Sequence, residues 1–167
     1  MSKSVCEEAN FKSIFISQSE GLRNFMYYKT GNHQEAEDLV QEAFGKLWEN
    51  CAKVIFEKAK SYLFTIANNL FLNQVAHQKV VLKFKQQKPA SQTNQNPQFL
   101  LEEEEFKKRL MDAISALPER QRIVFLMNRI DKKKYKEIAE LLDISVKAVE
   151  KRMHSALVSL RKIHKKV

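Results

Sequence analysis

The sequence of 167 residues has little glycine and little proline, three of each. Folds built from many short strands need these residues at their turns, so a multi-strand fold is excluded and long helices joined by few breakers are favoured. Hydrophobic residues make up 44% of the chain, which excludes disorder throughout. The length accommodates one domain or two small ones. The composition therefore predicts an all-α protein.

Cysteine is scarce too, since Cys6 and Cys51 are the only two. They lie far apart and form no Cys-x-x-Cys or Cys/His cluster, which argues against a zinc site and a disulfide framework and fits a reducing cytosol. The histidines have no paired carboxylate or thiol and are scattered along the chain at His33, His77, His154 and His164. We therefore expect no metal, no cofactor and no catalytic site.

Long hydrophobic runs are also missing. The stretch from Ser61 to Gln78 has no charged residue, but its amide and histidine side chains are too many for a lipid-facing helix. No apolar run suited to a signal peptide follows Met1. We therefore expect a cytoplasmic protein that does not insert into membranes.

Charge is abundant and unevenly distributed. The formal net charge is +9. Residues 51–88 and 119–167 form two basic blocks, whereas residues 31–50 carry a net negative charge. A basic balance points to a nucleic acid or an anionic surface. Because one segment has the opposite sign, two different kinds of partner are indicated.

A polar segment divides the chain. Residues 86–98 read QQKPASQTNQNPQ, which is typical of a flexible linker, and if extended they would span roughly 40 Å. We predict a helical domain over 9–84, a linker over 85–99 and a second helical domain over 100–167. The helices expected before the linker cover about 9–28, 32–49 and 58–82, and those after it about 99–116, 118–130, 134–142 and 145–164.

The segment Tyr135–Leu160, YKEIAELLDISVKAVEKRMHSALVSL, has helix-turn-helix spacing. Ala139 is small where the two helices would cross, Asp143 takes the usual place of glycine in the turn, and Ser145 caps the second helix. On that helix Val146, Val149, Met153, Ala156, Leu157 and Leu160 face inward. The outward residues are Lys147, Lys151, His154, Ser155 and Lys162, with Arg152 at one flank. The alternative is an ordinary helical hairpin with a solvated lysine face.

Two further helices carry functional signals. The helix expected over 58–82 has an uncharged polar face opposite its apolar half, formed by Thr65, Asn68, Asn69 and Asn73. Lysines flank that helix, and the aromatic residues Phe56, Tyr62 and Phe64 could stack on unpaired bases or belong to the core. The preceding helix bears an acidic stripe, which is either a solvated face or a contact for a basic protein, formed by Glu35, Asp38, Glu42 and Glu49.

These segments resemble a known family. The acidic helix EAEDLVQEAFGKLW, Glu35–Trp48, is similar to the core-polymerase-binding helix of bacterial sigma-70 factors, and SYLFTIANNLFLNQVAHQK, Ser61–Lys79, to their −10 promoter segment. Ala116–Lys162 resembles their −35-binding region. Two such regions joined by a short polar linker resemble the extracytoplasmic-function (ECF) group. Asp143, in place of glycine, and Asn69, where the family often has arginine, depart from its pattern.

The resemblance implies a fold of two small helical domains, a sigma region 2-like three-helix bundle and a sigma region 4-like helix-turn-helix domain. It also implies a function, which is to bind core RNA polymerase, recognise the −10 and −35 promoter elements and promote DNA opening. The polymerase-binding residues would be Glu35, Asp38, Gln41 and Glu42. The −10 residues would be Phe56, Lys58, Ser61, Asn68, Asn69, Asn73 and His77. The −35 residues would be Ser145, Lys147, Ala148, Lys151, Arg152 and Ser155.

The partners implied by the resemblance are core RNA polymerase, promoter DNA and an anti-sigma factor, and the free protein is expected to be a monomer. The alternative is a helix-turn-helix transcriptional regulator that is not a polymerase subunit. That class needs a dimer surface or a receiver domain, and the first half of this sequence predicts helices alone, with no phospho-acceptor pocket.

Overall fold

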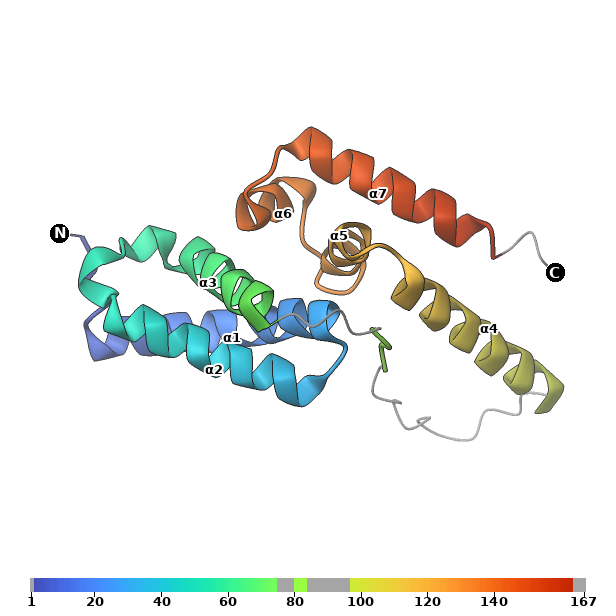
Figure 1. Ribbon diagram of the computed structural model, residues 1–167, viewed down its shortest axis with the longest axis horizontal. Helices are drawn as coiled ribbons and strands as arrows, with labels where there is room; N and C mark the ends of the chain where they lie inside the picture. The colour runs from blue at the N-terminus through green and yellow to red at the C-terminus, as the bar shows by residue number, and fades with distance from the viewer. Residues whose placement is uncertain (1, 75–79, 84–96, 164–167) are drawn as a thin grey trace.

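The computed structural model describes residues 2–74, 80–83 and 97–163 of the chain, and these residues form an all-α fold, as predicted (Figure 1). Short 3-10 turns η1 (Cys51–Lys53) and η2 (Phe56–Lys58) join α2 to α3. The helices are α1 (Glu8–Thr30), α2 (His33–Glu49), α3 (Ala59–Gln74), α4 (Pro97–Ala116), α5 (Glu119–Arg129), α6 (Tyr135–Leu142) and α7 (Val146–Arg161).

The sharp turn between α1 and α2 follows from two residues. Gly31 ends α1 with a left-handed backbone, φ 66°, and a Cβ at this position would lie 2.8 Å from the side chain of Val80, so glycine is needed on both counts. Asn32 then caps α2, because its side-chain oxygen accepts hydrogen bonds from the backbone N–H groups of Gln34 and Glu35. The predicted Asn32 cap is confirmed.

The first three helices form one bundle. α1 contacts α2 along its length, and α3 packs across both. The rings of Phe25 and Phe64 lie 5.1 Å apart, and both side chains are fully buried between α1 and α3. Apolar residues at helical spacing therefore build this core, as the periodicity predicts.

The third helix is shorter than predicted. It is described to Gln74, and Val80–Leu82, which were expected to belong to its last turn, lie outside any helix, as does Lys83. Leu82 is buried, its backbone N–H donates to the Ser115 hydroxyl at 3.1 Å, and the Lys83 N–H donates to the Tyr27 hydroxyl at 2.6 Å. These tertiary contacts outweigh the local helical preference.

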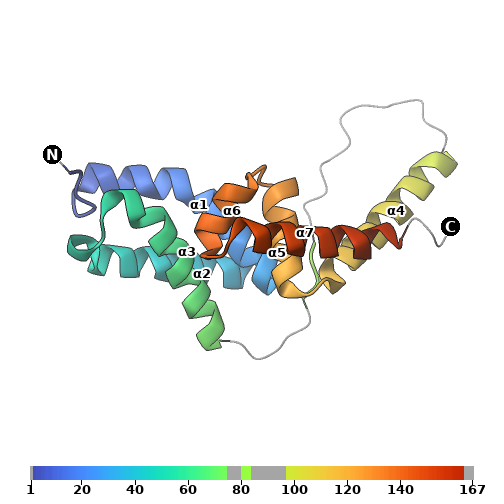
Figure 2. The same cartoon turned by 90° about the horizontal axis from the view of Figure 1, so that it is seen from above.

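The second bundle consists of α5, α6 and α7, with the end of α4 beside α7. The first half of α4 projects away from the rest of the molecule (Figures 1 and 2). Val124, Met127, Ile138, Val149 and Met153 are almost completely buried and fill the space among α5, α6 and α7.

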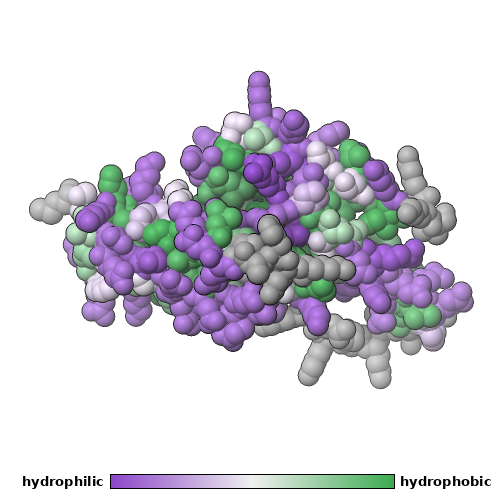
Figure 3. Space-filling view, in the orientation of Figure 1, coloured by the Kyte–Doolittle hydropathy of each residue, from purple (hydrophilic) through white to green (hydrophobic). Residues whose placement is uncertain are grey.

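The two bundles are packed against each other. α6 contacts α3 and α5 contacts α1, so the buried residues of both bundles form one continuous apolar cluster. Figure 2 shows α5 and α6 over the C-terminal part of α1. Hydrophilic side chains cover most of the face shown in Figure 3, with hydrophobic ones in small groups. Within the described residues, no helix is long and apolar enough to cross a membrane.

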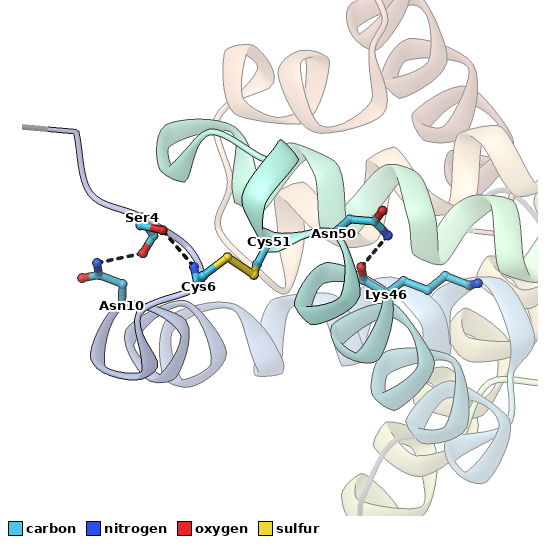
Figure 4. The surroundings of a disulfide bond; sticks show 6 residues. All are labelled: Ser4, Cys6, Asn10, Lys46, Asn50 and Cys51. Atoms are coloured by element: carbon cyan, nitrogen blue, oxygen red, sulfur yellow. Dashed lines mark hydrogen bonds between the residues drawn. A yellow bond between two sulfur atoms is a disulfide. The ribbon is translucent and has the colours of Figure 1, made fainter.

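The expectation that the two cysteines form no disulfide is wrong. Cys6 and Cys51 form a disulfide, with 5.0 Å between their Cα atoms (Figure 4). The segment before α1 pairs with the loop after α2 through an isolated antiparallel bridge between Ser4 and Ile55, and this pairing brings the cysteines together. Spacing along the sequence does not reveal such a contact, because 45 positions separate the two residues.

Candidate nucleic-acid interface

The helix-turn-helix consists of α6, a three-residue turn and α7. Asp143 adopts the left-handed backbone that the turn requires, φ 53° and ψ 49°. The Ile144 N–H donates to the Ala139 carbonyl at 3.0 Å, and the Ser145 hydroxyl accepts from the Ala148 N–H at 3.1 Å. The turn and the cap therefore fix the direction in which α7 leaves α6.

The structure brings the predicted −35 residues together at the beginning of α7. Lys147 and Lys151 are exposed, as is the capping Ser145, whereas Ala148, Arg152 and Ser155 are half-buried. Burial, and secondarily the charge of Arg120, lowers the pKa of Arg152. Val149, Met153 and Ala156 face the core as expected, but Val146 is 40% exposed, so its inward assignment is wrong.

The predicted −10 residues lie on η2 and α3. Asn69 and Asn73 are exposed on α3, as is Lys58 on η2, whereas Ser61 and Asn68 are half-buried. Phe56 packs partly against the core, and the Lys3 ammonium lies 5.4 Å from the centre of its ring. His77, the seventh predicted residue, lies outside the described residues.

The acidic stripe of α2 faces solvent. Glu35, Asp38, Gln41 and Glu42 are all exposed. The buried residues of α2 lie on the face toward α1 and α3 and are Ala36, Leu39, Val40, Ala43, Phe44 and Leu47. The Gln34 side chain donates to Asp38 at 3.0 Å along the helix. No group of three histidine, cysteine, aspartate or glutamate side chains that could hold a metal occurs in the part of the chain that the structure describes.

Polar contacts between the bundles are the main feature that the sequence did not indicate. Asp131, in the loop between α5 and α6, accepts hydrogen bonds from the Tyr28 hydroxyl at 2.7 Å and the Asn24 side chain at 3.0 Å. Its second carboxylate oxygen, Oδ2, is buried without a hydrogen-bond partner among the described residues. Burial raises the pKa of Asp131, although the hydrogen bonds and the charge of Lys133 oppose this.

Arg122 joins the ends of two helices. The residue is 5% exposed, and its side chain donates to the Tyr28 carbonyl of α1 at 2.9 Å. It also donates to the carbonyl of Ser115, in the last turn of α4, and to that of Leu117, just after α4, at 3.1 Å each. Carbonyls at a helix C-terminus have no partner within the helix, so a cation there satisfies them and interacts favourably with the helix dipole.

Lys29, at the end of α1, makes a third contact across the bundles. Its ammonium lies 2.8 Å from the Glu119 carboxylate of α5, and 5.3 Å and 5.1 Å from the ring centres of Phe25 and Phe71. Burial lowers the pKa of Lys29, and Glu119 opposes this. No sequence pattern singles out this lysine, because basic residues are common in the last turn of a helix.

Helix α3, to which the resemblance assigns −10 recognition, is in contact with α6. α6 packs on α3, and the Lys60 ammonium of α3 lies 3.9 Å from the Glu137 carboxylate of α6. The first helix of the helix-turn-helix therefore lies against the helix to which the sequence assigns −10 recognition.

Both halves of the chain match models of known protein families. Residues 18–80 match the family model for sigma-70 region 2, and residues 107–160 match that for sigma-70 region 4. The ECF RNA polymerase sigma factor SigW of Bacillus subtilis is 26% identical over 163 residues, covering 91% of this chain and 87% of SigW.

Two solved structures have a similar fold. The sigma factor RpoE in complex with the anti-sigma factor NepR, from Bartonella quintana, superposes with a TM-score of 0.62 at 21% identity, over 93% of this chain and 96% of that one. CnrH in complex with the cytosolic domain of CnrY gives a TM-score of 0.62 at 19% identity, over 93% and 88% of the two chains.

Two helical regions in this order, with an exposed basic helix-turn-helix in the second, define a sigma factor, and the chain belongs to the sigma-70 family. Within that family it is an ECF sigma factor, a protein through which RNA polymerase starts transcription at promoters.

Proposed function

We propose that three faces of the chain divide the work of promoter recognition. α7 enters the major groove of the −35 element, α3 and η2 bind the −10 element, and the acidic face of α2 docks on a basic surface of core RNA polymerase. The observation that carries this proposal is the separation of charge. Glu35, Asp38 and Glu42 are exposed on α2, and Lys147 and Lys151 are exposed on α7. The role is binding rather than catalysis.

The −35 contact divides into positioning and reading residues. Lys147 and Lys151 neutralise phosphates, which gives affinity without sequence preference. Ser145, Ala148, Arg152 and Ser155 reach base edges from the first turns of α7, the part of a recognition helix that enters the groove in helix-turn-helix proteins.

The −10 contact requires the DNA to open. The exposed amides of Asn69 and Asn73, with Ser61, Asn68 and His77, hydrogen-bond to bases of the separated strand, and Lys58 binds the neighbouring phosphate. The ring of Phe56 provides a surface on which an unstacked base rests, which compensates part of the cost of unstacking.

In the compact arrangement of the two bundles, the −10 and −35 elements cannot be bound at the same time. The −10 and −35 elements are separated by about 25 base pairs, or about 85 Å of straight duplex. α6 is joined to α7 by a three-residue turn and lies against α3. The helix-turn-helix must therefore separate from α3 before α3 can bind the −10 element while α7 binds the −35 element. The contacts between the bundles, from Asp131 to Tyr28 and Asn24, from Arg122 to Tyr28 and from Lys29 to Glu119, are therefore broken on the promoter.

An anti-sigma factor is a further partner in this proposal. The support comes from the RpoE structure, which was determined with an anti-sigma factor bound to a chain of the same fold. Such a partner would bind this chain away from the polymerase and compete for the faces assigned above.

Run-off transcription tests the function. Purified bacterial core polymerase is incubated with a pool of genomic fragments, with and without this protein, and the transcripts are sequenced. Transcripts with common upstream elements, appearing only when the protein is added, support the proposal. Specific DNA binding by the protein alone, with no new transcript from core polymerase, would contradict it and favour a conventional regulator.

A further inference from the structure

The disulfide and the ring that we assign to base capture belong to the same loop after α2. Residues Ser2–Glu7, called the strap here, run beside residues Cys51–Lys58, called the η loop. Cys6 of the strap is bonded to Cys51 of the η loop (Figure 4). Ser4 pairs with Ile55 through an isolated antiparallel bridge. Beyond the disulfide, the Asn10 side chain donates to the Ser4 carbonyl at 2.9 Å and so holds the strap from α1.

One side chain of the strap, Lys3, lies over the ring of Phe56. The ammonium of Lys3 lies 5.4 Å from the centre of the ring, within the range of a cation–π contact. A base that stacks on Phe56 needs that ring face. With the strap in place, Lys3 and an incoming base compete for the same position.

The non-covalent contacts of the strap are few. Val5 is fully buried, but Lys3, Ser4 and Glu7 are exposed. Burial of one valine side chain, with the hydrogen bonds from Asn10 to Ser4 and Glu7 and the single backbone bridge, contributes less than the conformational entropy lost when six residues are ordered. The disulfide therefore decides whether the strap stays on the η loop.

The chemistry of the cell interior makes this bond conditional. Disulfides are rare in reducing compartments, and those that form there are mostly transient and redox-sensing. Cys6 and Cys51 are both half-buried, with Cys51 packed against the edge of the core, so neither residue is fully closed off from solvent.

We propose that Cys6 and Cys51 form a thiol–disulfide switch that controls access of promoter DNA to Phe56. The disulfide form holds the strap over the ring and weakens binding of the −10 strand, and the dithiol form releases the strap. The inference rests on the proposed −10 role of the η loop, because without that role the bond would form with no effect on DNA.

The switch closes by exchange with a low-molecular-weight disulfide. One protein thiolate attacks a sulfur of that disulfide and releases one thiol, which gives a mixed disulfide. The second protein thiolate then attacks the protein-bound sulfur, closes the Cys6–Cys51 bond and releases the second thiol. The two protons of the protein thiols pass to the two released thiols. A dithiol reductant reverses both steps and is itself oxidised to a disulfide.

The first experiment tests the bond in the full-length protein. The protein is equilibrated with glutathione disulfide or with dithiothreitol, blocked with a thiol-alkylating reagent and analysed by mass spectrometry after digestion. We expect two alkylated cysteines in the reduced sample and a Cys6–Cys51 peptide pair in the oxidised one, with full reversal. Thiols that stay free in glutathione disulfide would overturn the switch, whatever the function of the η loop.

The second experiment tests the effect on DNA. Oxidised or reduced protein, freed of reagent, is assembled with core polymerase, and its affinity for a fluorescent single-stranded oligonucleotide carrying a mapped −10 element is measured by anisotropy. We expect the reduced form to bind at least about fivefold more tightly, because only this form leaves Phe56 free to stack on a base. The Cys6→Ser/Cys51→Ser variant should match the reduced form under both conditions.

Two variants distinguish a failure of the proposed switch from a failure of the −10 assignment. Lys3→Ala should restore part of the affinity of the oxidised form, because it removes the group that competes for Phe56. Phe56→Ala should weaken binding by the reduced form. If Phe56→Ala weakens binding but the two redox forms bind equally, the switch is overturned and the −10 assignment stands. If Phe56→Ala and the redox state both have no effect, the −10 assignment of this ring fails, and the control of DNA access fails with it.

Discussion

The hydroxyl of Tyr28 donates a 2.7 Å hydrogen bond to the carboxylate of Asp131, and this bond joins residues 103 positions apart in the sequence. Tyr28 belongs to α1 of the first bundle and Asp131 to the loop that leads into the helix-turn-helix of the second. Because both groups are largely removed from solvent, the bond is made in an environment where an unpaired partner is costly.

Tyr28→Phe should loosen the docking of the two bundles. The substitution keeps the ring and leaves the Asp131 carboxylate short of a donor, which costs about 1–3 kcal/mol for a buried group. Energy transfer between dyes placed on α2 and α7 would report a larger open population. Tyr62→Phe is the matched control, because the Tyr62 hydroxyl makes no hydrogen bond within the described residues. Equal distances in both variants would contradict the role of this bond.

Docking should depend on pH through Asp131. Its pKa is raised by burial in the docked form, so the docked form binds a proton more readily than the open form. Docking is then favoured most below the ordinary pKa of 3.8 and is progressively weakened as pH rises through the raised value. The same dye pair should show more opening with rising pH in this window. Asp131→Asn cannot titrate and should remove the dependence of the open population on pH. If this dependence is unchanged in the variant, another group such as Glu20 causes it.

Arg122→Met should destabilise the protein. Methionine fills much of the same space but leaves three helix-end carbonyls without their donor, at a cost of about 2–4 kcal/mol. Urea denaturation followed by circular dichroism would show the lower midpoint. Arg129→Met on the exposed side of the same helix is the control, and we expect it to change stability by less than about 0.5 kcal/mol. A similar midpoint for the two variants would show that the capping contacts contribute little.

Lys147→Ala and Lys151→Ala should each weaken binding to a −35 duplex. Each lysine is exposed on α7 and would neutralise one phosphate, so the loss should be similar for all sequences and should lower the salt-dependence slope by about 1. Binding titrations at several salt concentrations measure both quantities. Lys12→Ala, an exposed lysine of α1, is the control. If affinity and slope match those of the control, α7 does not contact phosphates through these lysines.

Reversal of charge on α2 should abolish association with core polymerase. The variant Glu35→Lys/Asp38→Lys/Glu42→Lys changes exposed side chains alone, so the fold should be retained while attraction to a basic surface becomes repulsion. Co-purification with core enzyme and circular dichroism test both parts. An equal reversal on α4, at Glu102, Glu103 and Glu104, is the control for net charge. If the α2 variant co-purifies with core enzyme as well as the unchanged protein does, the polymerase contact does not lie on this face of α2.

Local features of this fold were predictable because they depend on neighbours in the sequence. The caps at Asn32 and Ser145, the turn at Asp143 and the buried stripe of α2 each follow from side chains within a few positions of one another. The family was equally accessible, since the motifs of region 2 and region 4 are continuous segments. The individual contact residues on α2, α3 and α7 stay predictions.

The tertiary structure alone decided the contacts between distant segments. The docking of α6 on α3, the burial of Lys29 and Arg122, the hydrogen bond between Tyr28 and Asp131 and the Cys6–Cys51 bond all join parts of the chain with no shared local pattern. The physical reason is that the sequence does not show which charged residues are buried. Burial strips a charged side chain of its water, and this happens only when distant segments pack together. Only then does the need for a partner identify the residue to which it is bound.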